Sequence, residues 1–459
     1  MLLITILMIP KWPMWDVMKS LDQTHKDTKM LIDAFHDLGY KCILPVPRGV
    51  EHGAHGLADK AELVEMDIDL PDWKEEVMLT KEWYQLFNQF DGKYFYDVVV
   101  SEKIQPIAMV KKILAFTPET RNMYRTVPVP VVIGALPWIA LEGYGSTLML
   151  MPHDSDVVKW SLFYADKTVL GSPWEVSITL EALRKIFTPS VLKDVMKKIT
   201  WGRGFDLEGF KEKTKHIDKE KSDKPIVMTA GRPIVAKRFS DIATMFNKLM
   251  LLEPNVRCII NSQEKTSPEI KKLSQFYEGE LYLGQGFEPY LQRLKSADIF
   301  VVGSKTEGFC WTMFEAIVSG CVVVVIDEDW HKGLLPDDYP FVYGNFEQML
   351  SGIRLILEDV EGAKSKIDID KVIEHACGWE PYKNKWKGIF KEVFSSHQER
   401  FFEKASPGSL IGLSSQVLDG TEDFEGAKKK IASESSAGAA PHDFAVYSAL
   451  QYARGVYSK

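Results

Sequence analysis

The chain has 459 residues, of which 45% are hydrophobic and 26% are charged, and its formal net charge is −8. This length predicts two domains with room for an appendage, because a single hydrophobic core rarely grows so large. The acidic balance gives no overall attraction to polyanions, so a nucleic-acid partner would require a local basic patch. No apolar run approaches the ~20 residues that span a bilayer, so no membrane span is expected.

The cysteines and the first residues indicate the compartment. The five cysteines are scattered without metal-ligand spacing, at Cys42, Cys258, Cys310, Cys321 and Cys377. Their odd number and dispersion favour free thiols in a reducing cytosol. Residues 1–10 are apolar but few and lack a basic leader, so they are interpreted as a buried first strand rather than a signal peptide. A cytoplasmic protein is expected, in the host cytoplasm if a phage encodes it.

The first half predicts a doubly wound sheet. Apolar side chains recur at helical spacing over Thr24–Leu38, Gly39 stops that helix, and a strand lies on either side. Ligands of such sheets bind beyond the carboxyl ends of the strands. The strands expected here are Leu2–Met8, Lys41–Val46, Tyr96–Ser101, Val127–Ile133, Leu148–Met151 and Asp166–Ser172, and a helix is expected over Trp174–Phe187.

A second strand and helix series follows a polar, charge-dense segment that is interpreted as a solvated linker. Its strands are expected at Pro225–Ala230, Val256–Ile260, Leu281–Leu283, Ile299–Val302 and Val322–Ile326, and its helices from Lys237 to about Leu252, at Glu288–Lys295, Met349–Leu357 and Ile369–Cys377. The sequence thus predicts an α/β protein of two doubly wound, Rossmann-like domains facing each other across a cleft, with a C-terminal helical extension. The expected boundaries are 1–210 and 225–378 for the domains, 211–224 for the linker, 379–398 for a helix crossing back, and 399–459 for an accessory tail with a helix at Asp443–Tyr457.

Two carboxylates eight positions apart, Glu307 and Glu315, are the first candidates for chemistry. Gly308 lets the backbone approach a ligand, and the amides after Glu307 lie at a predicted helix N-terminus, where anions bind. One interpretation is a general acid/base pair like that of glycoside hydrolases. A second is a pair that grips opposite ends of one elongated ligand, and a third is a purely structural pair of a surface carboxylate and a helix-facing one. The neighbouring amides favour a phosphorylated ligand and hence the second interpretation.

Two further pairs of polar residues stand at strand ends. Arg232 and Lys237 flank a turn and a helix start, a place that suits a diphosphate bound by a bidentate Arg and a Lys point charge. His153 and Asp154 suit a base or a group that orients a hydroxyl, and a satisfied structural histidine is the alternative. The sequence has no Gly-x-x-x-x-Gly-Lys-Ser/Thr loop and no Gly-x-Ser-x-Gly elbow. This excludes a P-loop NTPase and argues against an α/β hydrolase.

Together these segments resemble the retaining GT-B glycosyltransferases with a Glu-x7-Glu motif, the family of sucrose synthase-like and mannosyltransferase-like enzymes. The resemblance covers Ile199 to about Asp327 and is weaker before it. The matching segments are Ile199–Phe210, Gly231-Arg232 with Lys237, Leu283-Gly284, Ala297-Asp298, Ser304, Glu307-Gly308-Phe309, Glu315-Ala316 and Gly320, together with His153-Asp154.

The resemblance implies a donor site for a nucleotide-diphosphate sugar. Arg232 and Lys237 would neutralise the departing diphosphate, Glu307 would bind sugar hydroxyls, Glu315 would hold the ribose, and His153 would touch the sugar. The implied site residues are His153, Asp154, Arg232, Lys237 and Glu307 for catalysis, and Trp12, Gly204, Gly308, Phe309, Cys310 and Glu315 for substrate binding. Such enzymes retain the anomeric configuration by same-face attack, with leaving-group stabilisation as the main catalytic contribution. Neither a metal ion nor a cofactor is expected.

Two departures from the family pattern leave the acceptor open. The first strand–helix loop contains Trp12 where the family has a glycine pair, and Cys310-Trp311-Thr312 stands where Gly-Leu-Pro is common. The acceptor is a small molecule, a glycan or, as in phage enzymes of similar size, a hydroxymethylated DNA base that would have to be flipped out. A binding module without catalysis is the alternative of another class, and a phosphorylase is disfavoured because a Lys-anchored cofactor signature is not recognised.

Overall fold

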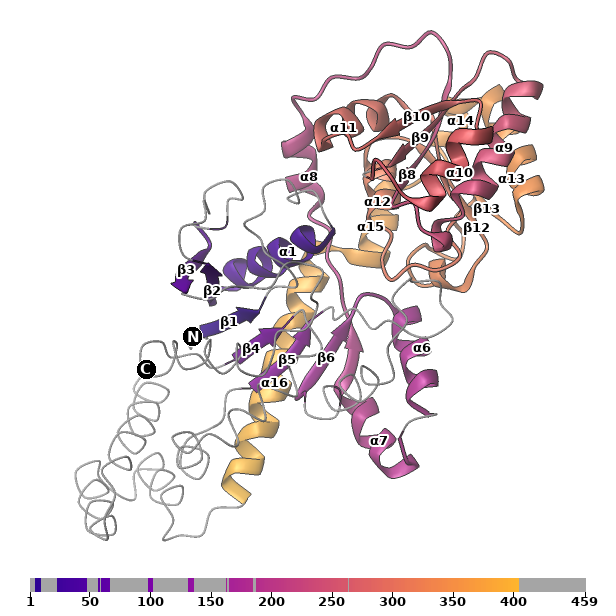
Figure 1. The fold of residues 1–459 in the computed structure, drawn as a ribbon. Helices are drawn as coiled ribbons and strands as arrows, with labels where there is room; N and C mark the ends of the chain where they lie inside the picture. Colours follow the sequence, from indigo (N-terminus) through magenta and orange to yellow (C-terminus); the bar gives the residue numbers. More distant parts are fainter. Residues whose placement is uncertain are drawn as a thin grey trace, which may run out of the picture.

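The computed structural model describes residues 5–9, 23–47, 57, 59–66, 98–101, 131–135, 162, 165–184, 187–262 and 264–403. Two parallel sheets with helices around them form two domains, the first in the lower part and the second in the upper part of Figure 1. This confirms the expected α/β class with two doubly wound sheets.

The first domain contains a seven-stranded sheet in the order β3-β2-β1-β4-β5-β6-β7. All its neighbouring strands run parallel. Its elements in chain order are β1 (Thr5–Ile9), α1 (Gln23–Asp37), β2 (Lys41–Pro47), β3 (Ala61–Met66), β4 (Val98–Ser101), β5 (Val131–Ala135), β6 (Lys167–Leu170), α6 (Pro173–Arg184), α7 (Pro189–Lys198) and β7 (Ile199–Trp201). The helical spacing seen in the sequence places Leu31, Ala34 and Phe35 of α1 in the core.

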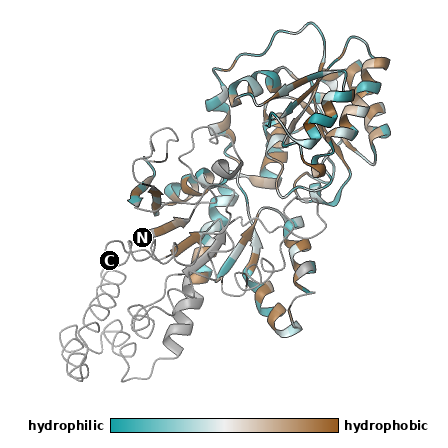
Figure 2. Cartoon of the chain, viewed as in Figure 1, coloured by the Kyte–Doolittle hydropathy of each residue, from teal (hydrophilic) through white to brown (hydrophobic). Residues whose placement is uncertain are grey.

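The second domain contains a six-stranded parallel sheet in the order β10-β9-β8-β11-β12-β13. Its elements are α8 (Leu207–Thr214), β8 (Ile226–Gly231), η3 (Val235–Lys237), α9 (Phe239–Leu252), β9 (Arg257–Ser262), α10 (Pro268–Phe276), β10 (Glu280–Leu283), α11 (Phe287–Ser296), β11 (Ile299–Val302), α12 (Trp311–Val318), β12 (Val322–Ile326), η4 (Asp329–His331), β13 (Val342–Tyr343), α13 (Phe346–Glu358), α14 (Val360–Lys364) and α15 (Ile369–Cys377). The strands β11 and β12 are wholly buried, as in parallel sheets covered on both faces, and strands of this domain are brown in Figure 2.

The long helix α16 (Trp379–Glu403) follows the second domain and packs against the first. In Figure 1 it runs down beside the first sheet. The ring centroids of Trp386 and Phe35 of α1 lie 5.0 Å apart in an edge-on contact, and Phe390 packs beside both. The C-terminal helical extension is therefore present, and its aromatic face completes the hydrophobic core of the first domain. The predicted tail helix at 443–457 lies outside the described residues.

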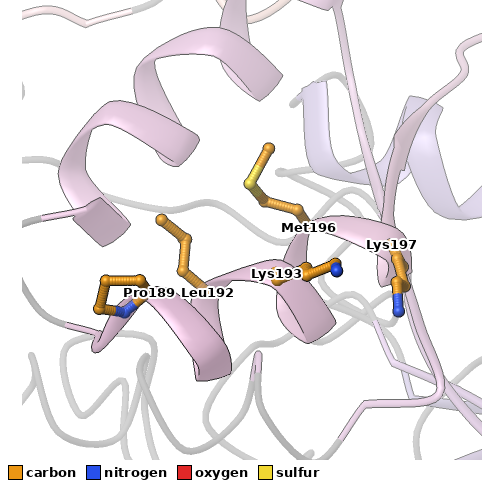
Figure 3. A pocket seen from close by; sticks show the side chains of 5 residues that line it. All are labelled: Pro189, Leu192, Lys193, Met196 and Lys197. Carbon is orange, nitrogen blue, oxygen red and sulfur yellow. The ribbon is translucent and has the colours of Figure 1, made fainter.

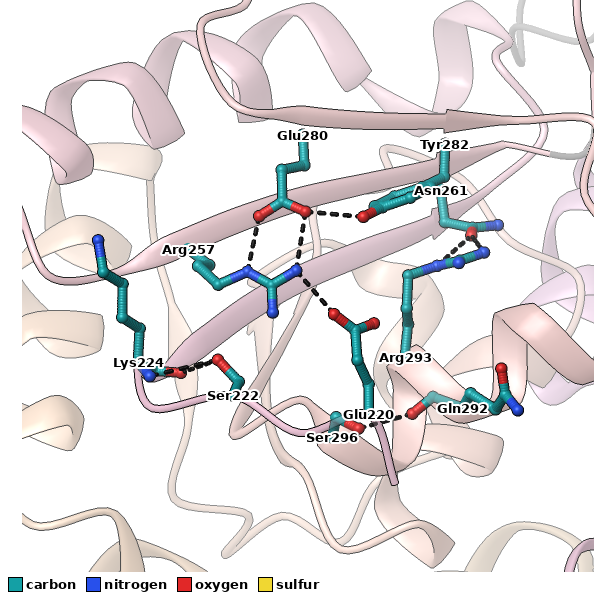
Figure 4. A network of polar contacts seen from close by, with 10 residues as sticks. All are labelled: Glu220, Ser222, Lys224, Arg257, Asn261, Glu280, Tyr282, Gln292, Arg293 and Ser296. Carbon is teal, nitrogen blue, oxygen red and sulfur yellow. Dashed lines mark hydrogen bonds and ion pairs between the residues drawn. The ribbon is translucent and has the colours of Figure 1, made fainter. Parts of the chain in front are cut away.

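The segment predicted to be a solvated linker is partly ordered. Its first four residues belong to α8, and Ile217 is buried in the core of the second domain. Farther along, Glu220 accepts a hydrogen bond of 2.8 Å from Arg257, which also binds Glu280 bidentately (Figure 4). The segment is therefore not purely solvated, because it contains an apolar anchor, Ile217, and an acidic partner for Arg257 of β9.

Other elements were not expected either: β3, α7, β7, α10, η4, β13 and α14. The two exposed glutamates of β3, Glu62 and Glu65, suit an edge strand and hide its apolar signal, and Glu62 pairs with Lys41 of β2. The predicted strand at 148–151 lies outside the described residues. None of the described helices combines the length and the apolar character needed to span a bilayer.

Candidate functional site

The order of strands in the second sheet reverses between β8 and β11, and the loops at the carboxyl ends of these two strands meet there. This is the switch point at which doubly wound sheets bind ligands. The loop after β8 leads into η3, which carries Lys237, and the loop after β11 carries Glu307. The Lys305 amide donates a 2.8 Å hydrogen bond to the Ala236 carbonyl and so joins the two loops.

Lys237 and Glu307 form an ion pair at this edge of the sheet. Their side chains are 16% and 10% exposed, respectively. Burial lowers the pKa of Lys237, but the charge of Glu307 and its hydrogen bond outweigh that effect, so the net pKa lies above the ordinary value. Lys237 is therefore a fixed positive charge at neutral pH.

The turn that presents Lys237 is conformationally strained. Arg238, the next residue, has a φ of 54°, the left-handed region that non-glycine residues avoid. Its guanidinium pairs with Asp241 and Glu328 and lies over the ring of Phe346, which holds it in this conformation. The predicted partner of Lys237, Arg232, is exposed in the same turn, and its charge lowers the pKa of Lys237. Both predicted cations thus lie near one another.

The 307–311 loop (Glu307 to Trp311) turns its aromatic side chains inward. Phe309 is 1% exposed and stacks on Phe314 of α12, with ring centroids 4.7 Å apart. Burial, together with the charge of Glu307, raises the pKa of Cys310 to about 12, so its thiol is protonated and is not a nucleophile at neutral pH. The side chains of Phe309 and Cys310 are therefore turned away from a ligand, and backbone groups, Glu307 and the partly buried Trp311 remain as candidates for contact.

Glu315 lies within α12 and is 2% exposed. Its Oε2 accepts a hydrogen bond of 3.0 Å from the hydroxyl of Tyr290 on α11. Glu307 is therefore not an exposed surface carboxylate, and Glu315 faces the interior of the domain, as a helix-facing carboxylate would. Tyr290 was not singled out in the sequence, because a tyrosine at helical spacing is ordinarily interpreted as a residue of the hydrophobic core.

The remaining predicted residues lie elsewhere. Gly204 follows β7 and lies against α16, where a Cβ atom would come within 2.6 Å of the Tyr382 ring. The close approach of the helix and this loop explains why a residue without a side chain is found at position 204. Trp12, His153 and Asp154 lie outside the described residues.

Side chains of the first domain reach the 307–311 loop. Glu175 lies in the first turn of α6 and accepts a hydrogen bond from the Gly171 amide at 2.5 Å, while its own amide donates to Ser172 Oγ at 3.2 Å. The same carboxylate lies against Gly308, where a Cβ atom would be 2.0 Å from Glu175 Oε1. The Ser-x-x-Glu spacing of a capping box was visible in the sequence, but its contact with Gly308 was not.

Elsewhere on the first domain, α7 carries a shallow, largely apolar hollow of about 400 Å³ (Figure 3). Leu192 and Met196 are one helical turn apart and share a face there, flanked by lysines. The hollow contains none of the predicted site residues. Within the described part of the chain, His, Cys, Asp and Glu side chains form no group of three or more that could hold a metal ion.

Comparisons with known proteins agree with this architecture. Residues 210–367 match the family described as "Glycosyl transferases group 1". The sulfoquinovosyl transferase SQD2 of Arabidopsis thaliana is 23% identical over 299 residues, which cover 59% of this chain and 56% of that protein. The chain thus spans little more than half the length of this curated relative.

Solved structures share the fold over most of the chain. Sucrose-phosphate synthase from Thermosynechococcus elongatus superposes with a TM-score of 0.60 at 16% identity, covering 86% of this chain and 100% of that chain. HepE of Anabaena in complex with UDP and glucose gives a TM-score of 0.56 at 13% identity, covering 86% and 100%. The chain therefore has the GT-B fold of these glycosyltransferases and carries a group 1 glycosyl transferase domain over residues 210–367.

Proposed function

We propose that the protein transfers a sugar from a nucleotide-diphosphate sugar to an acceptor hydroxyl, without a metal ion and with retention of the anomeric configuration. The observation that carries the proposal is the partly buried ion pair of Lys237 and Glu307 at the switch point of the second sheet. A partly buried, protonated lysine beside an exposed arginine at the end of a parallel strand suits a dianionic diphosphate.

Each of these groups has a distinct task in the proposed reaction. Glu307 accepts one hydrogen bond from the Lys237 ammonium, which has three N–H donors, so the others are available to phosphate oxygens. As the bond from the anomeric carbon to the phosphate oxygen breaks, Lys237 and Arg232 stabilise the charge that develops on the leaving diphosphate. The carboxylate of Glu307 keeps Lys237 in place and accepts hydrogen bonds from sugar hydroxyls.

The amides of Gly308, Phe309 and Cys310 complete the donor site in this proposal. They precede α12, so the N-terminal end of that helix adds partial positive charge for the sugar phosphate. Two cationic side chains and this helix end supply the charge that a divalent cation provides in other transferases. Same-face departure and attack, through an oxocarbenium-like state, accounts for retention.

The comparisons support a nucleotide-sugar donor. The HepE structures were obtained with UDP, with UDP and glucose, or with UDP-glucose, and sucrose-phosphate synthase shares the fold. UDP-linked sugars are therefore the first donors to test. A cytoplasmic location is part of the proposal, because all five cysteines are buried free thiols, which a reducing compartment preserves.

The deciding experiment is a donor-by-acceptor screen of the full chain read by mass spectrometry, with the anomeric configuration of the product determined by NMR. Transfer is expected to survive EDTA and to be lost in Lys237→Ala and Glu315→Ala. Lys248→Ala is the matched control, because Lys248 also pairs with a glutamate, Glu347, but on the exposed surface. Activity in Lys237→Ala equal to the wild type, or inversion of configuration, would overturn the proposed mechanism.

The same screen separates the alternatives for the acceptor and the class. Sugar transfer to a hydroxymethylated duplex, with binding that weakens steeply as salt rises, identifies a DNA acceptor. Donor binding without turnover on every acceptor indicates a binding module and rejects the enzyme.

A further inference from the structure

Asp27 connects both domains at the base of the 307–311 loop. It lies on α1 and is 2% exposed. One carboxylate oxygen forms an ion pair with Arg203, which follows β7, and the other accepts a hydrogen bond of 3.2 Å from the indole N–H of Trp311, the first residue of α12. Both carboxylate oxygens therefore have a partner, one in the first domain (Arg203) and one in the second domain (Trp311).

Arg203 contacts the same loop from the other direction. Its guanidinium carbon lies 5.0 Å from the ring centroid of Phe309 and 5.6 Å from that of Trp311. Its side chain is 5% exposed, and its Nε has no hydrogen-bond partner among the described residues. The cation is therefore held by one carboxylate and by the faces of two aromatic rings.

These contacts fix the part of the loop that the proposed donor needs. Phe309 and Trp311 flank Cys310, and the amides proposed to bind the sugar phosphate belong to this stretch. Breaking a buried ion pair leaves an uncompensated charge, so the arrangement strongly resists change.

We propose that Asp27 and Arg203 are positioning residues for the nucleotide-sugar donor. From the first domain they hold Phe309 and Trp311, and they thereby keep the 307–311 loop of the second domain in its donor-binding conformation without touching the donor. The inference rests on the proposed function for the identity of the ligand. Its structural part, that the first domain orders this loop, stands independently.

Two substitutions cut the connection at different points. Trp311→Phe keeps an aromatic ring and removes the N–H donor to Asp27. Asp27→Asn keeps an acceptor for the indole and removes the charge that pairs with Arg203. Trp379→Phe is the matched control, because the Trp379 indole donates a hydrogen bond of 3.1 Å to Asp37 of the same helix α1, away from the loop.

The measurements are the UDP dissociation constant by calorimetry and the amide hydrogen exchange of residues 303–318, both on folded protein verified by circular dichroism. Trp311→Phe is expected to weaken UDP binding by about three- to tenfold, the scale of one typical net hydrogen bond, and to speed exchange in the loop. Asp27→Asn acts in the same direction, and the double variant adds less than the sum of the single effects. With UDP-glucose hydrolysis as the readout, KM rises and kcat changes little.

The outcomes distinguish failure of this inference from failure of the proposed function. Wild-type UDP affinity and unchanged loop exchange in both variants would overturn the positioning role, as would equal losses in Trp379→Phe. A lower melting temperature with unchanged affinity and exchange would show a merely structural pair and would also overturn it. If the wild type binds no UDP or other nucleoside diphosphate while loop exchange still rises in the variants, the proposed function fails and the ordering of the loop stands.

Discussion

Tyr290→Phe tests how the buried glutamate of the proposed ribose site is held. The Tyr290 hydroxyl donates a 3.0 Å hydrogen bond to Glu315, and the two residues are 8% and 2% exposed. Burial raises the pKa of Tyr290 well above its ordinary value, and the charge of Glu315 raises it further. The hydroxyl therefore stays a donor over the whole accessible pH range, and its loss deprives a buried carboxylate of a partner.

The size of the effect follows from this geometry. A hydrogen bond to a charged group contributes about 1.5–3 kcal/mol, and a buried acceptor that loses its donor bears the full cost. The free energy of unfolding is expected to fall by about that amount. If half of the loss is transmitted to the orientation of Glu315, nucleotide affinity falls by about fourfold to tenfold, since 1.4 kcal/mol corresponds to about tenfold.

Tyr339→Phe provides the matched control. Tyr339 has the same exposure, 8%, and belongs to the same core, but its hydroxyl donates to the neutral carbonyl of Val323 at 2.8 Å. It is expected to lose about 0.5–1.5 kcal/mol of stability and no nucleotide affinity. Urea denaturation gives the stabilities, and calorimetric titration with UDP gives the affinities.

The reasoning fails if Tyr290→Phe binds UDP as tightly as the wild type while its stability falls. In that case the hydrogen bond serves folding alone, and Glu315 needs no orientation by α11. Equal losses of affinity in both variants would point to a general loosening of the core.

Three further predictions concern other parts of the molecule. Lys237→Gln is expected to lower the transfer rate by about 10²–10³, the scale of one preorganised charge-stabilising donor, as measured in steady-state kinetics. Gly204→Ala is expected to destabilise the fold by about 1–3 kcal/mol in thermal unfolding, because its Cβ would lie 2.6 Å from the Tyr382 ring. Burial lowers the pKa of Lys385 to about 8. Between about pH 8 and about 10.4 the folded chain has lost this proton while the unfolded chain still binds it, so the free energy of unfolding rises with pH. Lys385→Met is expected to abolish this rise.

The first two of these have a control within the chain. Lys248→Gln, at an exposed ion pair, leaves transfer unchanged. Gly388→Ala lies in α16 where a Cβ meets nothing, so it stabilises by roughly 1 kcal/mol. The ammonium of Lys385 also lies 4.0 Å from the Trp201 ring centroid, and this contact opposes the loss of its proton. A flat pH profile in the wild type would show that the ring contact outweighs burial.

The strands and helices with a strong local pattern were predictable from the sequence. The strands at Ile299–Val302 and Val322–Ile326 and the helix at Ile369–Cys377 have the predicted ends, because unbroken β-branched runs and a clear helical period bound them. The edge strand β3 and helix α8 were missed, since charged residues on an exposed face mask the period. The Glu-x7-Glu spacing and the Arg232–Lys237 turn pointed to one edge of the second sheet, where β8 and β11 end.

The contacts within the site depended on tertiary structure. Lys237 and Glu307 are 70 positions apart and meet because β8 and β11 are neighbours at the point where the strand order reverses. Asp27 reaches Trp311 across 284 positions, between two domains. Local sequence encodes periodicity and turn chemistry, but the pairing of distant loops follows from the order of strands in a sheet and from how two domains pack. The sequence by itself therefore determined the two sheets and the candidate diphosphate residues, and only the tertiary structure decided which side chains hold them in place.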